Sequence, residues 1–338
     1  MKQRFTLILI VITILCTSCS PASRIESCKV PERNIAATPN FKLLWSESNI
    51  SVHSDPLNPS LDGLNSTVFA VIYKTYTSSQ IMALDVRSGE MKWQRNVNLP
   101  VTIVASDTSL YMGSYDTLHE YDSQTGNVVR ETNFPNIGNI YNMFVNDQTL
   151  YALSSSGQWL IYNLEDNTSE LSERFLPYTP FITDNGILYL RDSEGFKATK
   201  IETGETLWRQ PIDEPINLHP LFVDNMIIIL SETGNIYALD KESGNLIWKL
   251  GTNVLSNVAA DTSRLFFLTK DGYLKVLDIG DGQELQNLQI SSTPFSVNSP
   301  RSDIAIGVYN IWADSQDQTV IFSLGDSCQL MALKLDNQ

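Results

Sequence analysis

The chain has 338 residues, and its 23 basic and 38 acidic side chains give a formal net charge of −15. This charge argues against nucleic acid as a partner, because affinity for phosphates comes mainly from clustered Lys and Arg. A hydrophobic content of 42% with 18% charged residues excludes a disordered chain, and four cysteines are too few for a disulfide-dense scaffold.

The N-terminus has the pattern of an export signal. Two basic residues precede an apolar run of 11 residues over 5–15. A membrane-spanning helix needs about 20 apolar residues, so the pattern predicts a signal peptide over residues 1–18. The small residues before Cys19 resemble a bacterial lipobox, although Cys16 stands where Leu is usual. This resemblance implies cleavage before Cys19 and a diacylglycerol anchor on its thiol; the alternative is a cleaved signal without lipid.

Residues 19–40 contain three prolines and show no sustained periodicity. We therefore predict a tether between the membrane and the folded body. If Cys19 carries lipid, Cys28 and Cys328 are the thiols that remain after cleavage. An exported protein meets an oxidising compartment, where these two cysteines either form one disulfide or stay unpaired.

The body of the chain repeats itself about every 40 residues. In the clearest copies, 81–93 and 236–248, a strand ends in Asp, a turn contains Gly and the next strand carries Trp. The turn glycines are separated by 37, 78, 40 and 38 residues, and they are Gly89, Gly126, Gly204, Gly244 and Gly282. The long gap holds a degenerate copy at 164–168. A period near 40 built from short strands predicts the blades of a β-propeller.

One blade shows the expected unit best, with strands a to d predicted over 221–224, 226–230, 235–240 and 246–250. Strand b is a continuous apolar run, which predicts burial between neighbouring blades. We assign the recurring turn and strand residues to structure. The Asp accepts a backbone N–H, the Gly supplies a positive φ and the Trp fills the space between adjacent outer sheets.

The copies count to seven blades, and the seventh, which starts near residue 306, lacks its fourth strand. The segment 41–45 precedes the first blade and carries Trp45, so it supplies that strand. We predict an all-β fold over residues 41–338: a seven-bladed β-propeller of four-stranded antiparallel blades, closed by the N-terminal strand. A Cys28–Cys328 disulfide would link the two ends of the chain where the ring closes. It would stabilise the fold by about 4–5 kcal/mol in the chain-entropy model.

The signature Ala-Leu-Asp-x-x-Ser-Gly-x-x-x-Trp at 83–93 and 238–248 resembles the repeat of pyrroloquinoline-quinone-type propellers. The resemblance covers nearly all of residues 41–335. Quinoprotein dehydrogenases of this kind normally have eight blades, a pair of adjacent cysteines and a calcium site of Asp, Glu and Asn; this chain has no such cysteine pair. It is more similar to non-enzymatic envelope lipoproteins of the outer-membrane-protein assembly scaffold type. That resemblance implies protein partners in the envelope and no cofactor.

The sequence contains no recognisable catalytic set. GxSxG, HExxH and P-loop motifs are missing, and His53, His119 and His219 have no metal-ligand spacing. His53 and His219 both fall on connections from strand d of one blade to strand a of the next. A shared site there is the alternative to two solvated histidines. We therefore predict no enzymatic activity; the alternative is a quinone- or sugar-binding propeller, or an enzyme, that uses the central funnel.

The longest connections, 47–58, 210–219 and 291–305, all join strand d to strand a and so lie on one face of the ring. Binding residues concentrate on loops held by a rigid scaffold, so we predict that protein partners bind this face. The candidate residues on it are His53, Asp55, His219, Ser296, Asn298 and Arg301. The alternative is that these loops bind nothing and are long only because the ring closes there. The predicted protein is an exported scaffold that meets the membrane only through lipid on Cys19, facing the periplasm or the exterior.

Overall fold

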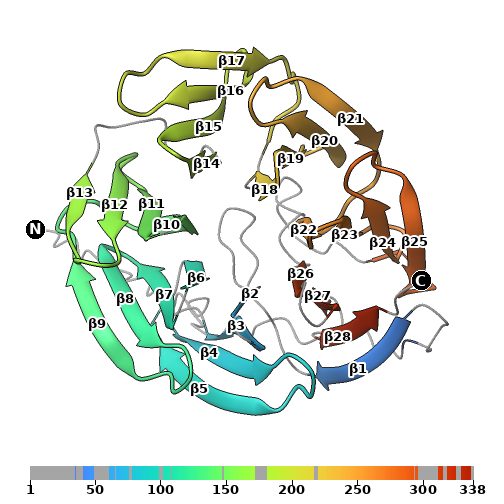
Figure 1. Ribbon diagram of the computed structural model, residues 1–338. Helices are drawn as coiled ribbons and strands as arrows, with labels where there is room; N and C mark the ends of the chain where they lie inside the picture. The colour runs from blue at the N-terminus through green and yellow to red at the C-terminus, as the bar shows by residue number, and fades with distance from the viewer. Residues whose placement is uncertain are drawn as a thin grey trace, which may run out of the picture.

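The computed structural model describes residues 35, 41–48, 61–64, 66–75, 78–98, 102–106, 108–146, 148–171, 181–216, 220–292, 294–295, 311–314, 318–324 and 329–335. These residues form seven four-stranded sheets arranged in a ring (Figure 1). The ring confirms the predicted seven-bladed β-propeller. Among the same residues, no helix is long and apolar enough to cross a membrane.

The first six blades each run in chain order from an inner strand a to an outer strand d. Blades one to three comprise β2 (Leu61–Leu64), β3 (Thr67–Thr75), β4 (Ser78–Asp85) and β5 (Met91–Val97); β6 (Thr102–Ser106), β7 (Ser109–Ser114), β8 (Thr117–Asp122) and β9 (Val128–Asn133); and β10 (Ile140–Asn146), β11 (Thr149–Ser154), β12 (Trp159–Asn163) and β13 (Ser169–Leu171). Blades four to six comprise β14 (Phe181–Asp184), β15 (Ile187–Asp192), β16 (Gly195–Lys200) and β17 (Thr206–Gln210); β18 (Leu221–Val223), β19 (Met226–Leu230), β20 (Asn235–Asp240) and β21 (Leu246–Gly251); and β22 (Ala259–Ala260), β23 (Arg264–Leu268), β24 (Tyr273–Asp278) and β25 (Glu284–Gln289).

The seventh blade joins the two ends of the chain. It consists of β26 (Ile311–Asp314), β27 (Thr319–Leu324), β28 (Gln329–Leu335) and, as its outer strand, β1 (Phe41–Ser48). The strands β1 and β28 are antiparallel, with Trp45 opposite Ala332, and Figure 1 shows them side by side although they lie at opposite ends of the colour scale. The predicted closure by the N-terminal strand is confirmed.

Burial of strand b between blades is also confirmed. In β19 the side chains alternate between two neighbours, because successive residues of a strand point to opposite faces. Ile227 and Ile229 pack in a cluster with blade-four residues, whereas Ile228 and Leu230 pack with blade-six residues. Each blade therefore shares its apolar faces with the blades on both sides, and the core is a series of inter-blade layers.

The turn between strands c and d repeats its hydrogen bonds from blade to blade. In blade one, the Asp85 carboxylate accepts the backbone N–H groups of Arg87 and Ser88 at 3.0 and 2.9 Å. The amide of Gly89 donates to the Asp85 carbonyl at 2.9 Å, with φ of +73° at the glycine. The structural roles predicted for the turn Asp and Gly are confirmed.

The tryptophan of strand d packs on its own blade, as Trp93 does on Phe69, and also against the c–d turn of the next blade. The indole N–H of Trp45 donates to the Val86 carbonyl at 2.8 Å, and a Cβ placed on Gly89 would lie 2.7 Å from the indole ring. The same contact recurs at three further junctions, namely Trp93 on Gly126, Trp208 on Gly244 and Trp248 on Gly282. We call this contact the indole lock.

The indole lock makes a testable distinction between two glycines of equal φ. Gly89 and Gly204 have φ of +73° and +70°, and Asn167 adopts +63° at the matching position of blade three. Gly204→Asn should therefore cost no more than about 1 kcal/mol. Gly89→Asn should cost about 1–3 kcal/mol more, because its side chain overlaps the Trp45 ring. Urea unfolding of the two variants measures the difference; equal losses would contradict the lock.

Candidate functional site

The residues that the sequence analysis singled out for binding lie outside the described residues: His53, Asp55, His219, Ser296, Asn298 and Arg301. The same holds for Cys19, Cys28 and Cys328, so lipidation and the disulfide stay predictions. Of the three predicted long connections, the structure describes residues 47–48, 210–216, 291–292 and 294–295, and it also describes the turns between strands b and c of blades two to six. We call the face that carries the d–a connections and the b–c turns the d–a face.

On the d–a face, three described connections are tied to the b–c turn of the blade they enter. The amide of Ser155 donates to the Asn139 carbonyl at 2.8 Å in blade three. In blade five, the amide of Glu232 donates to the Pro215 carbonyl at 2.8 Å, and in blade six the amide of Lys270 donates to the Asn253 carbonyl at 2.9 Å. These backbone hydrogen bonds fix the connections on the scaffold.

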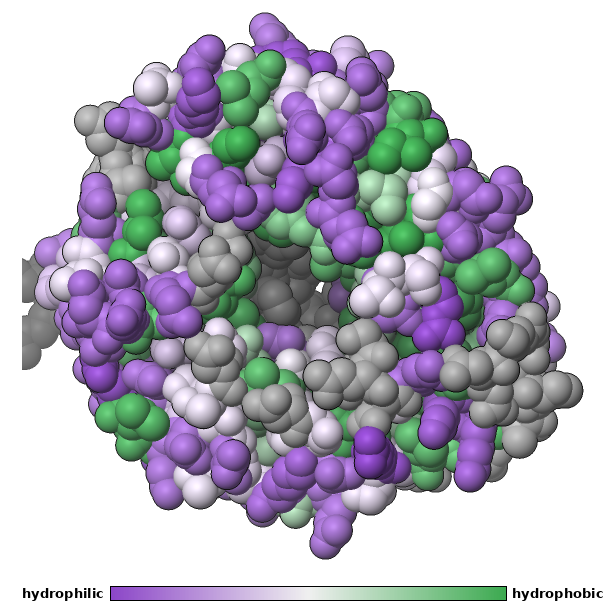
Figure 2. Space-filling model, in the orientation of Figure 1, coloured by the Kyte–Doolittle hydropathy of each residue, from purple (hydrophilic) through white to green (hydrophobic). Residues whose placement is uncertain are grey.

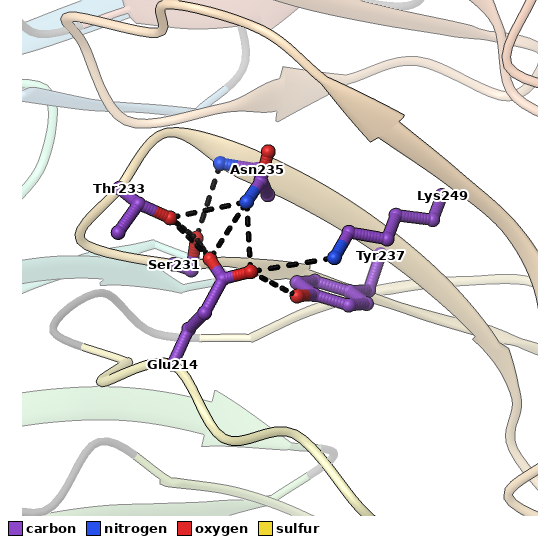
Figure 3. Close-up of polar contacts among 6 residues, drawn as sticks. All are labelled: Glu214, Ser231, Thr233, Asn235, Tyr237 and Lys249. Carbon is purple, nitrogen blue, oxygen red and sulfur yellow. Dashed lines mark hydrogen bonds and ion pairs between the residues drawn. The ribbon is translucent and has the colours of Figure 1, made fainter.

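In blade five, one carboxylate strengthens this tie. Figure 3 shows side chains of the b–c turn, β20 and β21 converging on Glu214, which lies in the connection from blade four. Ser231 Oγ donates to its carboxylate at 2.6 Å, the Tyr237 hydroxyl at 2.7 Å and Asn235 Nδ2 at 2.8 Å. The hydroxyl of Thr233 also donates, and Lys249 Nζ lies 3.3 Å away. We call these six residues the Glu214 clamp.

The clamp holds Glu214 in its ionised form. Burial opposes the charge, but the hydrogen bonds from Ser231, Thr233, Tyr237 and Asn235 outweigh it and hold the pKa of Glu214 well below its usual range. A carboxylate with a strongly lowered pKa is a poor proton acceptor. The arrangement suits a fixed loop rather than acid–base chemistry.

A second polar cluster lies on the d–a face of blade four. The Asp192 carboxylate at the b–c turn is 3.0 Å from Lys197 Nζ and 2.5 Å from Arg209 Nη1. Burial works against its charge, yet the hydrogen bonds from Arg209, Glu194 and Lys197 hold the pKa of Asp192 below its usual range. Blades four and five thus present two adjacent sets of fixed charges on this face.

The centre of the ring is hollowed (Figure 2), and the strands a line it. Of the aspartates on these strands, Asp62 and Asp184 each hold neighbouring blades together. Asp62 of blade one accepts the Ala105 amide of blade two at 2.7 Å, and Asp184 of blade four pairs with Lys241 of blade five at 2.9 Å. Burial raises the pKa of Asp62 to about 6, against the opposing effect of hydrogen bonds from Ala105 and Gly63.

The remaining histidine, His119, lies on strand c of blade two with Nδ1 3.1 Å from Glu131 on strand d. Within the described ranges, no group of three or more His, Cys, Asp or Glu side chains is arranged to hold a metal ion. The alternative of a site shared by His53 and His219 concerns residues outside the described ranges and stays a prediction.

The sequence analysis missed the Glu214 clamp. It identified 210–219 as a long connection but considered only His219 in it, because the partners of Glu214 begin 17 residues further along. The usable signal is the alternation of hydroxyl and amide side chains at 231, 233, 235 and 237 after an acidic loop residue. The sequence analysis also did not foresee that the first residues of the 291–305 connection are buried: Ser291 and Phe295 are only 4% and 5% exposed, and Phe295 packs in the core between blades six and seven.

Glu214→Gln should lower the free energy of unfolding at pH 7 by about 2 kcal/mol, because hydrogen bonds to a charged acceptor are lost. The pKa of Glu214 is lower in the folded protein, so its stabilising effect is complete above the unfolded pKa of about 4.3 and declines as the pH falls below it. The difference between wild type and variant should shrink between pH 5 and pH 3 in urea unfolding.

The matched control is Glu205→Gln, since Glu205 is 59% exposed and pairs with Lys200. It should change the stability by less than about 1 kcal/mol. A difference for Glu214→Gln that persists undiminished at pH 3, or one no larger than the control at pH 7, would contradict the clamp.

Comparisons with known proteins agree on one family. A family model described as outer membrane protein assembly factor BamB matches residues 46–132 and 147–305. The chain is 23% identical over 278 residues to the protein of that name from Yersinia pestis, covering 72% of this chain and 69% of that protein. It is 30% identical over 129 residues to the one from Nitrosomonas eutropha, covering 37% of this chain and 30% of that protein.

Solved structures show the same fold at low identity. BamB from Moraxella catarrhalis matches with a TM-score of 0.55 at 13% identity, over 88% of this chain and 98% of that chain. A chain of the mitotic checkpoint complex reaches a TM-score of 0.66 at 11% identity, over 91% and 97% of the two chains, so structural likeness by itself shows the propeller alone. The family model spans most of the ring, and the chain therefore belongs to the family of outer membrane protein assembly factor BamB.

Proposed function

We propose that this protein is an exported, lipid-anchored, non-enzymatic scaffold that holds protein partners during the assembly of outer-membrane proteins. The observation that carries the proposal is the family match over most of the ring. The relatives are named as outer membrane protein assembly factors, and the N-terminal export pattern agrees with a place in the envelope.

The geometry of the d–a face supports a scaffold role. A docking surface with little freedom loses less entropy on binding than a mobile one. The backbone ties of the connections and the Glu214 clamp supply this stiffness in blade five. The carboxylates described on the inner strands and in the clamp are engaged in contacts within the protein. This arrangement favours binding over catalysis.

The anchor can be tested directly. Cells grown with an alkyne-bearing fatty acid should label the wild-type protein, because the proposed lipid on Cys19 contains acyl chains. The Cys19→Ala protein should not be labelled and should be absent from the membrane fraction. The Cys16→Ala protein should be labelled and should stay in the membrane fraction. Labelling that survives Cys19→Ala, or wild-type protein without label, would contradict lipid attachment at this residue.

The docking face can be tested with a loop replacement that leaves the core intact. Because Phe295 is buried, residues 296–305 rather than 291–305 should be exchanged for a Gly-Ser segment of equal length. Cross-linking in the native envelope, followed by mass spectrometry, should show loss of the captured assembly protein with an unchanged melting temperature. The control is Glu90→Ala on the opposite face, which should capture normally.

Two outcomes of this experiment would contradict the proposal. One is undiminished capture by the loop variant, which would move the docking surface elsewhere. The other is that the wild-type protein captures proteins unrelated to the outer membrane, which would contradict the proposed function itself.

A further inference from the structure

The indole lock is not repeated at every junction between blades. Between blades two and three, both of its members are replaced together: Arg130 stands where the Trp is expected and Asn167 where the Gly is expected. Arg130 Nη1 instead donates to the Tyr162 hydroxyl at 3.4 Å, and this hydroxyl donates to Asn167 Oδ1 at 3.1 Å. A polar contact thus takes the place of the lock at that junction.

Between blades three and four, the glycine is kept but the tryptophan is missing. The turn at Gly204 has the hydrogen bonds of the locked turns, with the Gly204 amide donating to the Lys200 carbonyl at 2.9 Å and φ of +70°. Among the described residues, nothing lies within 4 Å of a Cβ placed on Gly204. The indole positions on Gly89, Gly126, Gly244 and Gly282 are all filled. Within the part of the chain that the structure describes, Gly204 therefore forms an open copy of a site that elsewhere holds an indole.

The outer strand of blade three, β13 (Ser169–Leu171), carries no tryptophan at the lock position. Leu171 stands four residues after Asn167, as Trp93, Trp208 and Trp248 stand four residues after the turn glycines of their own blades, and it is 41% exposed. β13 therefore places no indole on the Gly204 turn; the Trp159 indole of β12 packs elsewhere at this junction, with Leu188 of blade four.

The open site keeps the acceptor that an indole needs. In the filled locks, the indole N–H donates to the carbonyl of the residue three positions before the glycine, such as Val86 before Gly89. The corresponding carbonyl here belongs to Ile201, whose side chain is 41% exposed. We call Gly204 and Ile201 the blade-four socket.

The charge around the socket indicates which residues should flank the aromatic side chain of the partner. Glu202 and Glu205 flank Gly204 and are exposed, and Lys200 pairs with Glu205 at 2.7 Å. Residues 200–205 thus carry two carboxylates and one cation, in a chain whose formal net charge is −15. Complementarity favours basic residues beside the aromatic side chain that enters the socket.

We propose that the blade-four socket binds a tryptophan side chain on an extended, Lys- or Arg-flanked segment of a protein partner. The partner's indole would stack on Gly204 and donate its N–H to the Ile201 carbonyl, as the lock tryptophans do within the ring. The inference rests on the proposed scaffold function for its biological role, and it adds a second contact surface, on the face opposite the d–a loops.

The test uses the purified full-length protein and the peptide acetyl-Lys-Val-Lys-Trp-Lys-Val-amide with 5-fluorotryptophan, followed by ¹⁹F NMR into the millimolar range. Wild type should bind it, and the Trp→Ala peptide should fail to compete for binding. Gly204→Asn should weaken binding at least tenfold, because its side chain occupies the stacking surface while Asn tolerates this φ. The matched control is Gly186→Asn in the same blade, with φ of +72° and no described atom near its Cβ, which should bind normally.

A charge exchange gives a second readout that does not depend on Gly204. Glu202→Lys should weaken binding of the Lys-flanked peptide and strengthen binding of the same peptide with Glu in place of Lys. Both changes in affinity should diminish at high salt. If Glu202→Lys weakened the binding of both peptides equally, the charge next to the socket would not affect the choice of peptide, which would contradict the proposal.

Other outcomes would also overturn the inference. Absence of binding to wild type, equal competition by the Trp→Ala peptide, or equal losses in Gly204→Asn and Gly186→Asn would each exclude a tryptophan socket. Peptide binding that appears only in the double variant Phe175→Ser and Tyr178→Ser would show that side chains of this protein occupy the socket. That result would also contradict a binding site for a partner. Because the test uses a purified protein and a peptide, its failure leaves capture in the envelope untouched, and loss of envelope capture leaves peptide binding untouched.

Discussion

The fold depends on the contact between an indole on the outer strand of one blade and the turn glycine of the next. The contact requires a residue without a side chain at positive φ and a flat ring with an N–H donor at its edge. Its repetition at Gly89, Gly126, Gly244 and Gly282 fixes the spacing of successive blades at the rim. At Gly89 the ring comes from Trp45, so the same contact that spaces the blades also closes the circle.

A ring held in this way can carry loops without being distorted by them. Asp62 joins the inner strands of blades one and two, and Asp184 joins the inner strand of blade four to the c–d turn of blade five. The connections on the d–a face are tied to b–c turns. The ionised Glu214 adds a charged anchor for one connection. These features give a stiff body with fixed surface charges. They fit a protein that positions others better than one that turns over a substrate.

The repeat itself made the blades predictable, because the spacing of strand, turn and Trp lies within one copy. Closure by β1 followed from counting strands, since the seventh copy lacked the one that residues 41–45 supply. The indole lock was only half predictable. Each Trp was correctly placed between outer sheets, but its partner glycine lies in the next copy and pairwise spacing within a repeat does not reveal it. The Glu214 clamp and the burial of Phe295 arise from contacts between separate connections, which leave no periodic signal.

The most direct test of ring closure is the hydrogen exchange of the tryptophan indole N–H groups, followed by NMR on protein with ¹⁵N-labelled indoles. The indole N–H of Trp45 is buried against the Val86 carbonyl in the same way as those of Trp93 and Trp248 on theirs. The account predicts that all three exchange equally slowly, on the timescale of global unfolding. Rapid exchange at Trp45, with Trp93 and Trp248 still protected, would show an open seam and contradict the closed ring.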